Sequence, residues 1–112
     1  MKKDPKIFLA HIVECIDLVE EYSQGITQAS FLEDRVLQDA VIRRLEVIGE
    51  AVKGLPSTFR LKYPEIPWKQ MAGMRDVLIH EYFDVDLVLT WRVAKHELPP
   101  IKLKILELLF IE

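Results

Sequence analysis

The chain has 112 residues, 50% of them hydrophobic, and its formal net charge of −3 corresponds to a pI near 5.6. This length suits one domain, which we take to span residues 1–112. With only four glycines and no alternating strand run bounded by Asn-Gly or Gly-Gly turns, the sequence predicts an all-α bundle. The acidic balance excludes a broad basic footprint, so any contact with nucleic acid must be local.

The cysteine count and the lack of a recognisable targeting segment indicate the cellular compartment in which the protein is expected. The single cysteine, Cys15, cannot form a disulfide within the chain, and no secretory signal is recognisable at the N-terminus. The apolar segment at residues 101–111 is far shorter than the roughly 20 residues that a membrane span needs. We therefore expect a cytoplasmic protein with no membrane partner.

The first predicted helix begins at Asp4 and Pro5, since Asp is a favoured N-cap and Pro a favoured first helical residue. Gly25 is expected to end it. Apolar residues recur along it at three- and four-residue spacing, which predicts one buried stripe. The stripe consists of Phe8, Ile12, Cys15, Val19 and Tyr22. Cys15 is accordingly interpreted as a small core residue and not as a reactive thiol.

The second predicted helix runs toward Gly54, and two starts are possible. Ser30 with Glu33 resembles a capping box, while Thr27 could cap a slightly earlier start. Its apolar positions again follow the helical period, which predicts a second core-facing stripe. That stripe consists of Leu37, Val41, Leu45, Ile48 and Val52.

The opposite side of the second helix is charged. Arg43 is spaced to pair with Glu46 and with Asp39, so the ordinary interpretation is a solvated face held by ion pairs. An alternative is that Arg43 adds positive charge to a groove for RNA. The sequence leaves both interpretations open.

Prolines punctuate the connector after the second helix. Pro56 breaks the chain, and a short helical turn is plausible from Ser57 to about Lys62. Pro67 can start the next helical piece. Trp68 is interpreted as a packing anchor in preference to a platform for base stacking, because its large ring favours burial.

Residues 73–82, with the sequence GMRDVLIHEY, concentrate chemistry in an otherwise apolar stretch. Arg75 is a permanent cation with a planar fork of donors, and His80 can exchange a proton near neutral pH. Tyr82 adds a hydroxyl group. Together these side chains suit a reaction at a phosphate, although an isolated Arg-Asp pair and a lone His are more often structural.

The spacing of these residues sets a geometric problem. At about 100° per residue on an ideal helix, Arg75 and Tyr82 fall on nearly one face while His80 points away from Arg75. Asp76 and His80, four residues apart, would lie side by side, so that the carboxylate orients the imidazole. Either Arg75 reaches around, or the helix is irregular near Gly73, or a second copy completes the site. We favour the second copy, and hence a homodimer.

The last third of the chain predicts two further helices. Asp84 is a plausible N-cap for a helix that carries Trp91 into the core and ends before the Leu98-Pro99-Pro100 segment. Residues 101–111 are apolar on more than one face. We expect the bundle to cover one face and a partner chain the other.

Residues 68–86 resemble the signature of the HEPN superfamily, specifically its HepT-like branch, in which Arg, four residues, His, one residue and Tyr follow each other. Residues 43–51 resemble the second-helix pattern of the same branch, and the resemblance covers essentially the whole chain. It implies an antiparallel four- or five-helix bundle that dimerises. The chain departs from many HEPN proteins by carrying Asp76 where they carry Asn.

The resemblance also implies a function and its site. HepT-like proteins are toxins of toxin-antitoxin systems that cleave RNA without a metal, with catalytic Arg and His residues meeting between two protomers. By position these are Arg75 and His80, with Asp76 in support. The family further implies an MntA-type nucleotidyltransferase antitoxin as partner, which attaches AMP to the motif tyrosine, here Tyr82.

Chemical elimination points the same way and leaves alternatives. The sequence has no His-x-x-x-His or Cys-x-x-Cys pair, no phosphate-binding glycine loop and no nucleophile elbow, so we expect no metal and no cofactor. Proton transfer by His80 and charge stabilisation by Arg75 suffice for RNA, whose 2'-hydroxyl is its own nucleophile. The main alternative is a catalytically silent helical dimer that serves as a scaffold for the nucleotidyltransferase. A weaker one is a complex that modifies another target.

Overall fold

The computed structural model describes residues 4–81 and 84–111, without the side chains of residues 77 and 79–81. It is predominantly helical, which confirms the all-α class. In chain order the elements are α1 (Pro5–Ser23), α2 (Gln28–Glu33), α3 (Arg35–Gly54), α4 (Ser57–Leu61), α5 (Trp68–Ala72), α6 (Met74–Leu78), β1 (Ile79–Glu81), β2 (Asp84–Val85), α7 (Leu87–Arg92), the π-helical turn η1 (Val93–Glu97) and α8 (Leu98–Ile111).

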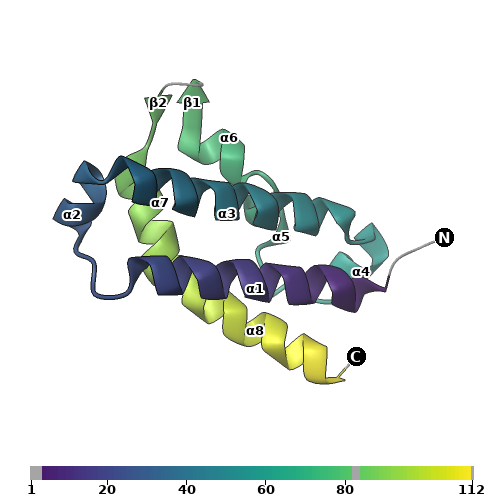
Figure 1. Ribbon diagram of the computed structural model, residues 1–112. Helices are drawn as coiled ribbons and strands as arrows, with labels where there is room; N and C mark the ends of the chain where they lie inside the picture. The colour runs from purple at the N-terminus through teal and green to yellow at the C-terminus, as the bar shows by residue number, and fades with distance from the viewer. Residues whose placement is uncertain (1–3, 82–83, 112) are drawn as a thin grey trace.

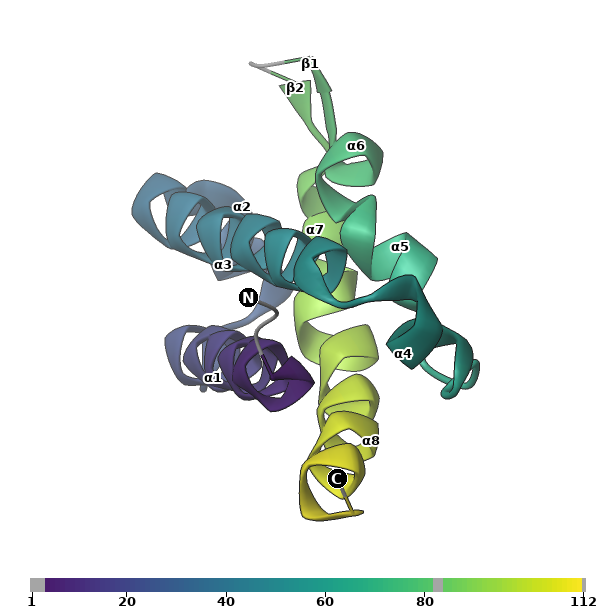
Figure 2. The same cartoon turned by 90° about the vertical axis from the view of Figure 1, so that its right-hand side faces the viewer.

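Two long helices and one composite rod make up the body of the molecule. Helices α1 and α3 lie side by side and antiparallel, while α7, η1 and α8 form a continuous rod that crosses them (Figure 1). The rod packs on α1 through η1 and α8, and on α2 and α6 through α7. Seen from the side, α5, α6 and the two strands rise along one flank of α3 (Figure 2). This flank carries the sequence motif.

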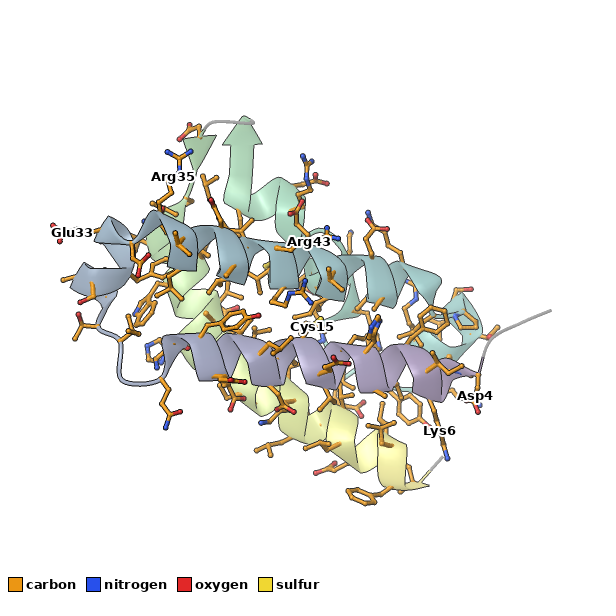
Figure 3. All side chains as sticks on the ribbon, viewed as in Figure 1. Asp4, Lys6, Cys15, Glu33, Arg35 and Arg43 are labelled. Carbon is orange, nitrogen blue, oxygen red and sulfur yellow. The ribbon has the colours of Figure 1, made fainter. Side chains whose placement is uncertain are left out.

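The core lies between α1, α3 and the rod, where the predicted stripes point. Every predicted apolar residue of α3 is buried, and Ile12, Cys15 and Val19 of α1 are buried with them. Phe8 and Tyr22 pack at the edge of the core. Cys15 lies between α1 and α3 (Figure 3), and burial raises the pKa of its thiol above the ordinary value despite the nearby Arg44 guanidinium. The core interpretation of Cys15 is confirmed.

The helix caps follow the prediction at α1 and depart from it at α3. Asp4 caps α1, as predicted. The predicted second helix is divided in two, because Asp34 adopts an extended conformation and accepts a hydrogen bond from the Leu37 amide at 3.0 Å. Thr27 caps the preceding short helix α2 by accepting from the Ser30 amide at 3.1 Å. The Thr27 alternative is therefore right, and the capping box of Ser30 with Glu33 is wrong.

The motif segment contains a small β-hairpin where the sequence predicted none. Strands β1 and β2 pair antiparallel, with Ile79 opposite Val85 and Glu81 opposite Asp84. The Asp86 amide donates to the Leu78 carbonyl at 2.7 Å and closes the base of the hairpin. These two-stranded contacts do not alter the helical class, but they end α6 at Leu78.

The predicted helix after the motif begins later and continues further than expected. Asp84 lies in β2, and Asp86 is the N-cap, accepting from the Leu89 amide at 3.0 Å. The rod then passes through Pro99 and Pro100 without ending. Both prolines lie in the first turn of α8, where missing amide donors are tolerated, directly after the π-helical turn η1.

The C-terminal helix is anchored on one side and leaves apolar groups exposed on the other. Lys102 Nζ lies 2.9 Å from Asp17 Oδ1 and 3.0 Å from Glu20 Oε1, and these hydrogen bonds raise the pKa of Lys102. Leu103, Phe110 and Ile111 remain largely exposed. Apolar groups thus occupy more than one face, as predicted. None of the described helices is long and apolar enough to cross a membrane.

Candidate functional site

Helix α5 is fixed by its first residue. Trp68 is buried, and its indole N–H donates to the Tyr63 carbonyl at 3.0 Å, while Pro67 precedes the first turn. The ring packs against Phe59 at 6.4 Å between ring centroids. The interpretation of Trp68 as a packing anchor is therefore confirmed, and α5 is held at a defined position beside α3.

Close approach of α3 to the end of α5 depends on Gly49. A Cβ atom at this position would lie 3.1 Å from the Met71 carbonyl oxygen and 3.3 Å from that of Ala72, closer than such atoms normally come. The missing side chain thus lets the two backbones pack together. Gly73 then ends α5 and separates it from α6. The helix is therefore irregular near Gly73, which is one of the three possibilities raised by the spacing of Arg75 and His80.

Enlarging Gly49 is expected to destabilise the protein and displace α6. Gly49→Val should lower the free energy of unfolding by about 1–3 kcal/mol, because the added atoms meet backbone that cannot rotate away. Ala10→Val on the exposed face of α1 is the matched control and should cost only about 0.5 kcal/mol of helix propensity. Urea denaturation compares the two variants, and equal midpoints would contradict the close packing at Gly49.

The packing of α6 on α3 places Arg75 beside Glu46. Arg75 Nε donates to Glu46 Oε2 at 3.0 Å, and the two side chains are 61% and 30% exposed. Within the described residues, Arg43 forms no ion pair. The predicted pairing of Arg43 with Glu46 is therefore wrong. The Glu46 carboxylate pairs with Arg75, which lies on a different helix.

A hollow of about 370 Å³ lies between α3 and the α5–α6 segment. Its lining residues are Arg43, Glu46, Gly49, Glu50, Lys53, Ala72, Arg75 and Asp76. Figure 3 shows Arg43 on the part of α3 beside which α6 lies. We call this the α3–α6 hollow.

The α3–α6 hollow carries balanced charge. Three cationic side chains and three carboxylates line it, and Lys53 lies 3.6 Å from Glu50 in a second ion pair. Its formal charge is therefore zero. A phosphate entering the hollow would gain little from the overall field and would depend on donors that point at it.

The structure brings together two of the four predicted site residues. Arg75 and Asp76, both on α6, line the α3–α6 hollow. His80 belongs to β1, beyond the end of α6, and its side chain lies outside the described residues. Tyr82 also lies outside the described residues. The expected contact between Asp76 and His80 and the expected shared face of Arg75 and Tyr82 both assumed a regular helix through residue 82. That assumption is wrong, because α6 ends at Leu78 and residues 79–81 form β1.

Sequence reasoning missed the roles of Glu46 and Gly49. Both fall in residues 43–51, the segment that carries the second-helix pattern, but charge spacing alone predicts a solvated face for Glu46. The signal that could have found them is a carboxylate and a glycine three residues apart in that pattern. Among the side chains that the structure describes, which do not include those of residues 77 and 79–81, no group of three or more His, Cys, Asp or Glu is placed to hold a metal ion.

Comparisons with known proteins agree on one family. The family model described as "Ribonuclease HepT-like" matches residues 12–108. A protein of Methanocaldococcus jannaschii named "Gamma-glutamylcyclotransferase and putative RNase" is 55% identical over 97% of the chain, which spans only 49% of that relative. The "Probable ribonuclease HepT" of Thermococcus cleftensis is 48% identical over 91% of the chain and 93% of the relative. No solved structure matches the chain significantly.

Proposed function

The chain belongs to the HepT-like ribonuclease family, and on this premise we propose that it is a metal-independent endoribonuclease. The observation that carries the proposal is the placement of Arg75. Its side chain is 61% exposed and lines the α3–α6 hollow, and its guanidinium group is held by Glu46. A fixed but accessible cation of this kind can hold a phosphate while charge develops on its oxygens.

In the proposed reaction the substrate supplies the nucleophile. The ribose 2'-oxygen loses its proton to a general base and attacks the adjacent phosphorus, and the bond from phosphorus to the 5'-oxygen breaks. A general acid returns a proton to that leaving oxygen. We assign the proton transfers to His80 and the stabilisation of the phosphate oxygens to Arg75, with Asp76 in support. DNA, which lacks the 2'-hydroxyl, is not a substrate.

Cleavage by this route leaves 2',3'-cyclic phosphate and 5'-hydroxyl ends, and it is expected to persist in EDTA. The reason is that neither activation of the nucleophile nor charge stabilisation is assigned to a metal ion. Purified protein incubated with labelled RNA and with the DNA of the same sequence, each with EDTA or magnesium, tests this. Loss of cleavage in EDTA with recovery in magnesium would contradict the proposal.

We propose that the active form is a homodimer. Support comes from the exposed Leu103, Phe110 and Ile111 of α8, which a partner can cover, and from α6, which ends at Leu78 before His80 is reached. Analytical ultracentrifugation at micromolar concentration should give twice the monomer mass of 13.1 kDa. A monomer that is fully active would overturn the dimer.

We further propose that the protein is the toxin of a two-component system and that a nucleotidyltransferase silences it. In this reaction the Tyr82 oxygen would attack the α-phosphate of ATP, losing its proton, and pyrophosphate would leave. The product carries AMP on the tyrosine. This regulation rests on the family relationship and on the position of Tyr82, two residues after His80.

A further inference from the structure

We infer that Glu46 is the positioning residue of the site: it holds Arg75 by Nε so that the two terminal nitrogens of the guanidinium face the substrate phosphate. The inference deepens the proposed ribonuclease function and rests on it. Glu46 would not touch the reacting atoms. It would act only through the orientation of Arg75.

The atoms used by the ion pair support this role. A guanidinium group offers five N–H donors in a rigid plane. Glu46 Oε2 accepts from Nε at 3.0 Å, and within the described residues neither terminal nitrogen of Arg75 has a hydrogen-bond partner. The terminal edge, which can bind two phosphate oxygens in parallel, therefore stays available. Glu46 orients the arginine without occupying its phosphate-binding edge.

The support beneath Glu46 is rigid. Glu46 lies near the middle of the 20-residue helix α3, one turn from Gly49, where the backbone of α5 packs against the helix. Its side chain is only 30% exposed, whereas that of Arg75 is 61% exposed. The fixed partner is thus the carboxylate on the long helix, and the orientable partner is the arginine on the five-residue helix α6.

Charge balance makes the orientation matter. Because the formal charges lining the α3–α6 hollow sum to zero, phosphate is not drawn in by an excess of cations. Binding and transition-state stabilisation would then depend on directed hydrogen bonds, whose strength falls steeply with misalignment. A misplacement of about 1 Å can cost on the order of 10²-fold in rate.

Two Glu46 variants separate positioning from simple repulsion of RNA. If Glu46 positions Arg75, Glu46→Ala should lower kcat on the order of 10-fold to 100-fold with KM unchanged or smaller. Glu46→Gln keeps an oxygen acceptor and should recover much of kcat. If Glu46 merely repels RNA, both variants should instead gain activity, which would overturn the inference. Glu14→Ala, an exposed carboxylate on α1, is the matched control and should behave as the parent.

A double-mutant cycle tests whether Glu46 acts through Arg75. In the Arg75→Ala background, Glu46→Ala should change kcat by less than about twofold, because the group that it orients is gone. Independent, multiplicative losses would mean that Glu46 acts on something else, and the inference would fail. Urea denaturation of each variant excludes unfolding as the cause.

A readout without catalysis keeps this inference separate from the proposed function. In ¹⁵N-labelled protein, the Nε–H signal of Arg75, assigned by its loss in Arg75→Lys, should exchange slowly with water and faster in Glu46→Ala. Unchanged exchange would overturn the ion pair and the inference. If the Arg75 Nε–H exchanges faster in Glu46→Ala but kcat is unchanged, the inference is overturned while the proposed ribonuclease activity is not. A parent that cleaves no RNA would overturn the proposed function, and the role of Glu46 with it.

Discussion

Replacement of either Arg75 or His80 by alanine should remove at least about 10²-fold of the RNA cleavage rate. For Arg75 the reason is visible in the structure: its side chain is largely exposed and lines the α3–α6 hollow, and its Nε is the atom that Glu46 holds. For His80 the reason is chemical, since it is the motif side chain that can transfer protons near neutral pH. Single-turnover cleavage of a labelled RNA measures both losses, and folding is checked by circular dichroism.

Conservative variants make the test sharper. Arg75→Lys keeps the positive charge but loses both Nε and the planar terminal edge, so it should fail almost as badly as alanine. Growth arrest on expression of the chain alone should disappear in His80→Ala. Full activity in His80→Gln would favour the alternative of a silent scaffold for a nucleotidyltransferase, because glutamine cannot serve as a general base.

The long helices could be predicted from the sequence because the apolar residues that stabilise them repeat at helical spacing along a short stretch of chain. Over four turns of α3 the apolar residues return at three- and four-residue spacing, and each of them is buried. Asp4 with Pro5 at the start of α1 is equally local, since the cap is completed within two residues by the Lys6 amide. Information of this kind is contained within a few neighbouring positions.

The errors share a different cause. Whether residues 79–81 continue α6 or form a strand is decided by pairing of Ile79 with Val85 and by the hydrogen bond from the Asp86 amide to Leu78. Asp84 and Asp86 are equally suitable as N-caps in the sequence. In the structure Asp84 belongs to strand β2, so Asp86 caps α7. Such choices depend on contacts that a single segment does not reveal.

The candidate site illustrates the same limit. Arg75 could be identified from its motif, but its partner Glu46 lies 29 residues away on another helix. From spacing alone, Arg43 was the natural partner, because i,i+3 neighbours face each other on a helix. Packing through Gly49 brings α6 close enough for Arg75 to take that carboxylate. The motif is therefore enough to propose Arg75 as a site residue, whereas the contact that holds its side chain could not be predicted from the sequence.

Tyr82→Phe should remain folded and should escape silencing by the partner nucleotidyltransferase. An AMP group on the hydroxyl would add a negatively charged phosphate and a purine close in sequence to His80. In our proposal the attached phosphate competes with RNA for the terminal nitrogens of Arg75, and the purine obstructs the substrate. Phenylalanine has no oxygen to modify, so cells that express both proteins should arrest with Tyr82→Phe and grow with the parent.

Intact mass after co-expression decides the chemistry of this silencing. The parent should gain one or more AMP-sized additions, and peptide mapping should place them on Tyr82. Tyr22→Phe is the matched control: Tyr22 packs at the edge of the core on α1, so this variant should still be modified and silenced. If Tyr82 merely packed against the core, Tyr82→Phe would behave as the parent in growth and in mass. An addition that maps elsewhere would leave cleavage by Arg75 and His80 intact as a hypothesis and would remove Tyr82 as the point of control.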